Sequence, residues 1–284
     1  MIPPTMTIKI HNSKAHNDEV VAAALLLAYW DSTAVIVRTN TIHELDYQDP
    51  YVAVVDVGRT HDPDLMCFDH HQRGRDEAPE CAFSLVAKHY GIAEKLSKYE
   101  GWFNTWRNID ATGPYNAANI DGIELDAALN WIPPVSEMFL EWFSEQDIIE
   151  PFTQAHDMLL KWGQKLRKKL EAYEAFEKKA AEKKLVVGDD HKVVYDMFDF
   201  GEEAFQFSDW FLKDHPETSA LVRINSRDPS GEECGITRIT HADGTFDFDF
   251  GRVTSPTSFK HSNGFYMTGD HALVRKFLKE GRLV

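Results

Sequence analysis

The chain has 284 residues, of which 43% are hydrophobic, enough for one large or two medium domains with packed cores. Acidic residues outnumber Lys and Arg by 46 to 30, and the net charge of −16 argues against a protein that coats duplex nucleic acid through overall positive charge. Cys67, Cys81 and Cys234 lack the spacing of a zinc site or a disulfide scaffold, which favours a reducing compartment. No signal peptide or apolar run of spanning length is recognisable, so we expect a cytoplasmic protein without a membrane segment.

Strands and helices alternate along the first part of the chain. Short apolar or alternating runs predict strands at residues 6–10, 34–38, 51–55 and 65–68. Helices are predicted at residues 19–30 and 81–90, and residues 92–150 are expected to be mainly helical. Such alternation is typical of a mostly parallel sheet with helices on both faces, so the predicted fold class is α/β.

The second part of the chain begins with a long helix. Apolar residues at every third or fourth position predict one amphipathic helix over residues 152–184, with nine Lys or Arg between Lys161 and Lys184. The strand and helix patterns after Gly188 predict a smaller α+β domain. We therefore expect a first domain at 1–150, a basic linker helix at 151–186 and a C-terminal domain at 187–284.

Two groups of large apolar residues between the strands of the first domain and the long helix have alternative interpretations. Core packing is favoured for Trp102, Phe103 and Trp106, with stacking on nucleobases as the alternative. A second group is either core or an oligomer face, so a homodimer is compatible with the sequence. It consists of Met138, Phe139, Trp142 and Phe143.

Polar residues gather where the predicted strands of the first domain end. They are His11, His16, Asp18, Asp56, Asp69, His70 and His71, with Asp110 as a further candidate. Strand ends are where α/β sheets hold their ligands. Imidazoles and carboxylates together suit Mn²⁺, Zn²⁺, Fe²⁺ or Co²⁺, and this number of side chains suffices for two ions bridged by Asp56. His71, Arg73 and Arg75 are then suited to contact a phosphate group.

Simpler interpretations remain open for single residues. Asp18 is also placed to cap a helix, and Asp69 to orient a neighbouring imidazole. Arg73 and Arg75 also fit an ordinary solvated loop. The joint pattern H-x₄-H-x-D, D-x-G and D-H-H, with each part at a strand end and in this order, favours the metal site.

The sequence motifs that carry this pattern resemble a known family. "VDVG" at 55–58 and "DHH" at 69–71 resemble the DHH phosphoesterase superfamily. Within it, "IHNSKAHNDE", "FDHHQRG", "CAFSLVAKHYG" and "FKHSNGFYMTG" are most similar to the melanocyte-proliferating-gene exonuclease-like branch, also called metal-dependent protein hydrolases. The chain departs from this branch at Ser13-Lys14-Ala15, where no ligand is expected, and at Met267-Thr268-Gly269, where one Gly of a pair is lost.

The resemblance implies a DHH-type catalytic domain that holds two divalent ions, Mn²⁺ first, with Mg²⁺, Co²⁺, Fe²⁺ or Zn²⁺ as alternatives. One ion would be held by His11, His16 and Asp56, and the other by Asp18, Asp56, His70 and Asp110, with Asp121 as the rival of Asp110. The implied catalytic residues are His71, Asp69 and Arg73. The implied substrate-binding residues are Arg75 and, in the C-terminal substrate-binding domain, Lys260, His261 and Asn263.

Three functions follow from this set of residues. The first is a metal-dependent phosphodiesterase, an exonuclease on single-stranded RNA or DNA or on short oligonucleotides, in which water activated by two metal ions attacks phosphorus. The second is a hydrolase of a small phosphate compound, such as a cyclic dinucleotide, pyrophosphate or a nucleotide. The third is a binding protein that keeps the metal site for stability without turnover.

Overall fold

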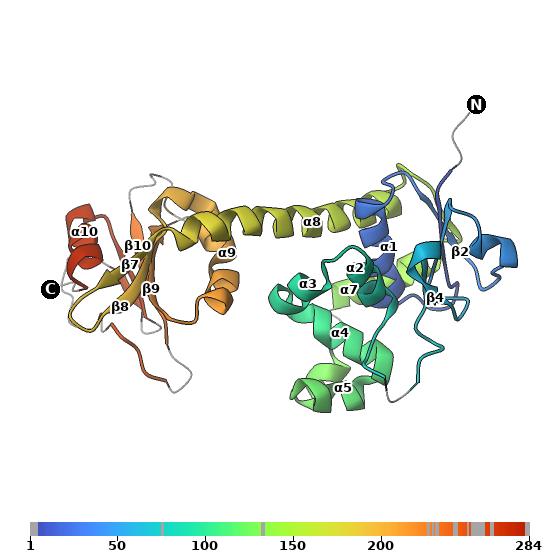
Figure 1. Cartoon of the computed structure of the whole chain (residues 1–284), viewed down its shortest axis with the longest axis horizontal. Helices are drawn as coiled ribbons and strands as arrows, with labels where there is room; N and C mark the ends of the chain where they lie inside the picture. Colours follow the sequence, from blue (N-terminus) through green and yellow to red (C-terminus); the bar gives the residue numbers. More distant parts are fainter. Residues whose placement is uncertain are drawn as a thin grey trace. The chain divides into compact units, whose positions relative to one another are not determined.

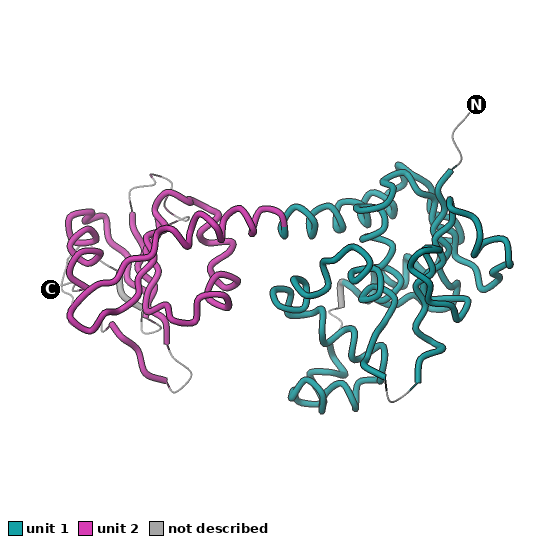
Figure 2. Tube along the Cα trace, in the orientation of Figure 1, with its two compact units in different colours: residues 1–170 teal, residues 171–284 magenta. Residues whose placement is uncertain are grey.

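The chain forms two compact units, residues 1–170 and residues 171–284 (Figure 2). The computed structural model describes residues 5–74, 77–131, 134–225, 228, 230, 233–240, 244–248, 250, 259–261 and 264–281. The division between the units falls inside one helix, α8 (Gln154–Ala181). No helix within the described ranges combines the length and the apolar character needed to cross a membrane.

The first unit is built on a six-stranded sheet in the order β4-β5-β3-β1-β2-β6 (Figure 1). Its strands are β1 (Thr7–Ile10), β2 (Val35–Arg38), β3 (Val52–Val55), β4 (His61–Asp62), β5 (Cys67–Phe68) and β6 (Ile148–Ile149). β1 pairs in parallel with β2 and β3, and β3 pairs in parallel with β5. Only the two-residue edge strands β4 and β6 are antiparallel. The prediction of a mostly parallel α/β sheet is thus confirmed.

Helices supply the rest of the first unit. They are α1 (Asn17–Tyr29), α2 (Ala82–His89), α3 (Ala93–Tyr99), α4 (Gly101–Thr112), α5 (Pro114–Asp121), α6 (Leu125–Leu129) and α7 (Pro134–Ser144). Residues 18–28 of α1 are buried on every side, as expected for a helix that is apolar around its whole circumference. On α7, Phe143 is fully buried whereas Met138 is exposed. The apolar group at 138–143, predicted to be either core or an oligomer face, therefore divides between core and surface.

The start of α8 packs against α1 at Gly163. A Cβ atom at this position would lie 1.9 Å from the carbonyl oxygen of Ala24, so only glycine permits the two helices to approach so closely. On the same helix, Lys161, Lys165 and Lys168 are exposed, while Lys169 forms an ion pair of 2.7 Å with Glu100. The basic character of this helix is therefore partly neutralised within the first unit.

The second unit holds another six-stranded sheet, in the order β11-β12-β10-β9-β8-β7. Its strands are β7 (Lys184–Val187), β8 (Lys192–Asp196), β9 (Thr218–Ile224), β10 (Cys234–Arg238), β11 (Phe259–His261) and β12 (Phe265–Thr268). All pairs are antiparallel except β8 with β9, which α9 (Gly201–Asp214) connects. The helix α10 (His271–Glu280) places Val274 and Phe277 in the core of this unit.

Candidate metal centre

The polar residues predicted from the strand ends lie close together in the first unit. His11 and His16 follow β1, Asp56 follows β3, and the Asp-His-His sequence at 69–71 follows β5. These three strands are parallel, so their carboxyl ends meet at one edge of the sheet. α1 adds Asp18 at this edge, and α4 adds Asp110.

Asp56 lies at the middle of this group. Its Oδ2 atom is 3.3 Å from Nε2 of His11, and its Oδ1 atom is 3.4 Å from Nε2 of His70. Its side chain is buried, and its backbone adopts a left-handed φ of +55°. Because non-glycine residues rarely adopt this conformation, the chain accepts local strain to turn the carboxylate toward the imidazoles.

Three sets of side chains have ligand atoms that lie, within each set, no more than 4.8 Å from one another. The sets are His11, His16, Glu19 and Asp56; Asp56, His70 and His71; and Asp18, Cys81 and Asp110. Asp110 links them, because its carboxylate lies 3.1 Å from Nε2 of His70 and 3.5 Å from Nδ1 of His16. The rival carboxylate of Asp121 instead accepts a hydrogen bond from Asn108 at 2.6 Å. The geometry therefore favours Asp110 over Asp121.

Buried polar atoms without partners test whether a cation fits this cluster. They are Nε2 of His11, Nδ1 of His16, both carboxylate oxygens of Asp56 and Nε2 of His70, none of which has a hydrogen-bond partner among the described residues. Buried polar atoms are nearly always hydrogen-bonded in proteins, so three imidazole nitrogens around one carboxylate, whose own two oxygens also lack hydrogen bonds, call for a missing partner. A divalent cation meets this need, since every one of them is a ligand atom.

The charges of the cluster point to the same conclusion. Burial raises the pKa of Asp18 well above its usual range, and the neighbouring carboxylates of Asp110 and Asp56 raise it further. Burial opposes protonation of His11 and His70, but the adjacent carboxylates outweigh it and raise these pKa values to about 9 and about 11. The carboxylates thus attract positive charge, which protons or divalent cations can supply.

Cation binding is expected to release protons near neutral pH, since the carboxylates favour the protonated forms of His11 and His70, which must ligate as neutral imidazoles. Cation affinity is therefore expected to rise with pH and to fall as protons compete at lower pH. Titration calorimetry with Mn²⁺ in buffers of different ionisation enthalpy measures the number of protons released. Heats that do not depend on the buffer would contradict protonated imidazoles in this cluster.

Asp18 caps a helix, but not the helix that the sequence suggested. Its two carboxylate oxygens accept the backbone N–H groups of Ala82 and Phe83 at 2.8 and 2.7 Å. These groups belong to the first turn of α2, where free N–H groups need acceptors. Asp18 therefore caps α2, a different helix from the one that contains it, while its carboxylate lies 3.5 Å from Nε2 of His70.

Asp69 holds His71 in a fixed orientation. One oxygen of Asp69 lies 2.8 Å from Nδ1 of His71 and accepts the backbone N–H of His71, while the other accepts the N–H of Arg59 at 2.7 Å. This contact raises the pKa of His71, so Nδ1 carries a proton and Nε2 is left for other partners. About half of the His71 side chain is exposed, as required of a group that contacts substrate.

Arg73 lies beside the metal centre and is paired with an acidic residue. Its guanidinium forms an ion pair of 2.9 Å with Glu77, and with His70 it lines a polar cavity of about 460 Å³. Arg75 and Asn263 lie outside the described residues, as do the side chains of Lys260 and His261, whose backbone forms part of β11. The roles implied for these four residues remain predictions.

Two residues of the cluster were not identified from the sequence. Glu19 is fully buried, and its carboxylate lies 3.3 Å from Nε2 of His11 and 3.1 Å from Nδ1 of His16. The sequence offered one signal for Glu19: it is the last residue of the motif "IHNSKAHNDE" and follows His16 by three residues. Cys81, also fully buried, joins Asp18 and Asp110, and burial raises the pKa of its thiol well above the usual range.

Ser13, one of the departures from the family pattern, contacts a predicted ligand. Its hydroxyl oxygen and its backbone nitrogen lie 2.9 and 3.2 Å from Nδ1 of His11. When Nε2 of His11 binds a cation, Nδ1 carries the proton, and the Ser13 hydroxyl is the acceptor within reach. Ser13, although it departs from the family pattern, therefore lies beside the predicted ligand His11.

Replacing Ser13 with Ala is expected to weaken cation binding by about ten-fold, because His11 loses the partner that orients its ring. Ser97→Ala serves as the matched control, since the Ser97 hydroxyl donates to Asn104 at 2.9 Å on α3 and α4. Calorimetric Mn²⁺ titrations of the two variants compare the affinities. Equal affinities would remove Ser13 from the site.

Comparison with known proteins gives one family. Residues 7–101 match the family model MYG1_exonuc, described as "Uncharacterised protein family (UPF0160)". The matched segment includes every predicted ligand except Asp110, so the resemblance seen in the motifs is confirmed for the part of the chain that forms most of the cluster. No curated protein matches the chain significantly.

Two solved structures have weak similarity to the chain. The pGpG-specific phosphodiesterase PggH from Vibrio cholerae is 14% identical, with 96% of this chain and 97% of that chain covered and a TM-score of 0.25. An uncharacterized protein from Helicobacter pylori G27 is 12% identical, with 83% and 86% covered and a TM-score of 0.23. TM-scores this low establish neither fold nor function.

Proposed function

We propose that the chain, whose residues 7–101 match the MYG1_exonuc family model, is a metal-dependent phosphodiesterase that removes nucleotides from the end of single-stranded RNA or DNA, or of short oligonucleotides. The observation that carries the proposal is the set of unpartnered, buried ligand atoms around Asp56. These side chains suit divalent cations of the Mn²⁺ type, and such cations are the usual cofactors for phosphodiester hydrolysis.

In the proposed site, His11, His16 and Asp56 would hold one divalent cation. Asp18, Asp56, His70 and Asp110 would hold the other. Glu19 is buried against His11 and His16, so it orients these imidazoles or adds a ligand. When bound, the divalent cations supply positive charge that stabilises the phosphoryl oxygens and lowers the pKa of water.

His71 is the residue proposed to face the scissile phosphate. Asp69 holds its Nδ1 proton, so Nε2 presents the second proton of the imidazolium to a phosphoryl oxygen. A charged donor fixed in this way stabilises the negative charge that develops on the phosphate without reorganising during the reaction. Arg73 contacts the same phosphate in this proposal, and to do so it exchanges its ion pair with Glu77 for the substrate.

A panel of substrates with Mn²⁺ tests the proposal. It contains an end-labelled single strand of about twenty nucleotides, a dinucleotide, a cyclic dinucleotide and pyrophosphate, each assayed with the wild-type chain and with Asp56→Asn. Stepwise shortening of the strand by the wild type alone is the expected result. Cleavage of the small compounds alone would replace the exonuclease by a hydrolase of small phosphates. Cation binding without any cleavage would favour a protein that binds without turnover.

A further inference from the structure

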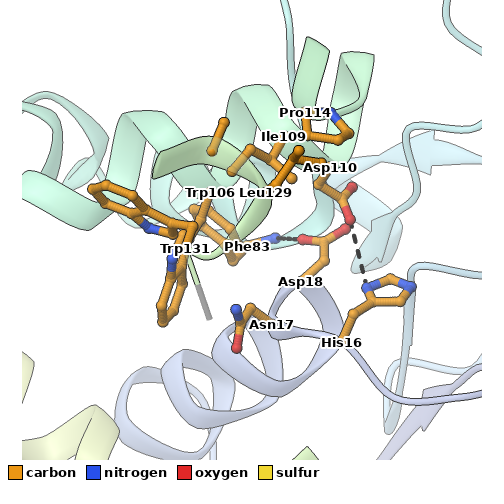
Figure 3. A pocket seen from close by; sticks show the side chains of 11 residues that line it. His16, Asn17, Asp18, Phe83, Trp106, Ile109, Asp110, Pro114, Leu129 and Trp131 are labelled. Atoms are coloured by element: carbon orange, nitrogen blue, oxygen red, sulfur yellow. Dashed lines mark hydrogen bonds and ion pairs between the residues drawn. The ribbon is translucent and has the colours of Figure 1, made fainter. Parts of the chain in front are cut away.

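A cavity opens directly beside the metal centre, within the first unit. It has a volume of about 170 Å³ and shares His16, Asp18 and Asp110 with the cluster (Figure 3). Figure 3 shows that these three polar side chains lie at one side of the cavity, with aromatic and aliphatic side chains around the rest. A group inside the cavity therefore adjoins whatever is bound at the metal centre.

Apart from the Asn17 amide, the remaining wall of the cavity is apolar and rich in aromatic rings. Phe83, Trp106, Leu129 and Trp131 form much of it, and no Lys or Arg among the described residues lines it. A cavity of about 150 Å³ with apolar walls is large enough to bind benzene, so this cavity of about 170 Å³ has room for at least one aromatic ring. Without a cationic side chain it is unsuited to bind a phosphate, whereas it suits an uncharged aromatic group.

Trp106 is held in place by other rings and has an unused donor. Its indole packs against Trp102 at a ring distance of 4.9 Å, and Trp102 in turn packs against Phe83 at 5.9 Å. The Trp106 indole N–H is buried and has no hydrogen-bond partner among the described residues. The side-chain amide of Asn17 also lines the cavity and offers a donor and an acceptor.

We infer that this cavity is a nucleobase subsite, which binds the unpaired base of the nucleotide whose phosphate lies at the metal centre. The inference rests on the proposed phosphodiesterase function and specifies its substrate. A nucleobase combines a flat ring that stacks on aromatic side chains with edge atoms that accept hydrogen bonds. Trp106 provides both interactions, and base stacking, the less favoured alternative from the sequence, becomes its assigned role.

The subsite restricts the substrate in two ways. A base in a duplex would first have to unpair and unstack at a cost in free energy, so single strands and strand ends are favoured. Phosphate compounds without a base, such as pyrophosphate or sugar phosphates, leave the cavity unfilled and bind more weakly. The aromatic cavity therefore gives nucleotides a higher affinity than phosphate compounds that lack a base.

Competition between two ligands that differ only in the base tests the subsite without any mutation. Full-length protein with Mn²⁺ is titrated with 2-aminopurine ribonucleoside monophosphate, whose fluorescence is quenched when it stacks on an indole. Adenosine monophosphate is expected to displace this probe at a concentration about ten-fold or more below that required of ribose 5-phosphate. Equal displacement by both ligands, or an absence of quenching, would overturn the inference.

Three variants assign the effect to Trp106. Trp106→Leu is expected to reduce the quenching, with Trp131 as the indole that remains in the wall, and to weaken the preference for adenosine monophosphate. Trp106→Phe keeps a ring for stacking and retains more of the preference. The matched control is Trp142→Leu on α7, since Trp142 packs against Phe139 and does not line the cavity. A Trp106→Leu variant that is folded by circular dichroism and retains the full preference would contradict the assignment.

The binding assay separates failure of the subsite from failure of the proposed function. Cleavage that Asp56→Asn abolishes, together with equal binding of the two ligands, would reject the subsite and leave the phosphodiesterase intact. A clear base preference in a protein that cleaves none of the panel would reject the enzymatic proposal and keep the subsite as a nucleotide-binding site.

Discussion

Replacing Asp56 with Asn is expected to reduce turnover by more than about a thousand-fold and to remove most of the bound cation, since even residues that only orient metal ligands contribute about 10–100-fold. Asp56 is the carboxylate that lies within 3.4 Å of both His11 and His70. An amide has one acceptor oxygen and no charge, so it cannot bridge two cations. Asn adopts the left-handed backbone conformation as readily as Asp, so the fold is expected to persist.

Asp64→Asn is the control for this variant, because Asp64 is exposed and lies in the short turn before β5, within the same unit. Turnover on the substrate panel and cation content by native mass spectrometry are measured for both variants, with circular dichroism to verify folding. A folded Asp56→Asn variant with wild-type turnover would eliminate the two-cation arrangement. Loss of turnover with unchanged cation content would show that Asp56 acts on the substrate and not on the cations.

The strands that position the site could be predicted because their sequences are short and distinct. β1 and β3 lie within the predicted runs, and apolar side chains buried on both faces explain the continuous Val and Ala run of β3. The edge strands β4 and β6 were missed, since two residues carry no periodic signal. The strand predicted at 65–68 covers only Cys67–Phe68 in the structure. Met66 adopts a left-handed φ of +54° and ends the turn at 63–65, so β5 begins at the next residue.

The sequence predicts the cluster to the extent that the order of the parallel strands determines where their carboxyl ends lie. Parallel strands bring their carboxyl ends together, so residues after β1, β3 and β5 could be expected to meet. The burial of Glu19 and the capping of α2 by Asp18 depend on contacts between segments distant in sequence, which no local pattern specifies. The choice of Asp110 over Asp121 likewise depends on the direction in which α4 places its side chains.

Asp69→Asn is expected to reduce turnover by about a hundred-fold or more while leaving cation affinity near the wild-type value. Asp69 accepts three hydrogen bonds, one from Nδ1 of His71 and two from the backbone N–H groups of His71 and Arg59. An amide accepts through its oxygen alone, so its NH₂ group must face one of these donors. Whether this donor is the Arg59 N–H or the pair from His71, the negative charge that holds the proton on Nδ1 of His71 is lost.

The pH profile distinguishes this effect from a loss of packing. The hydrogen bond and charge of Asp69 raise the pKa of His71, so the protonated imidazole persists to higher pH in the wild type. Without that carboxylate the pKa falls, and the loss of turnover on raising the pH is expected to begin at a lower pH in Asp69→Asn. Asp62→Asn, which removes a charge from the N-terminal cap of the turn at 63–65, is the control and should keep the wild-type profile. An unshifted profile in Asp69→Asn would mean that the proton on His71 is not required for hydrolysis.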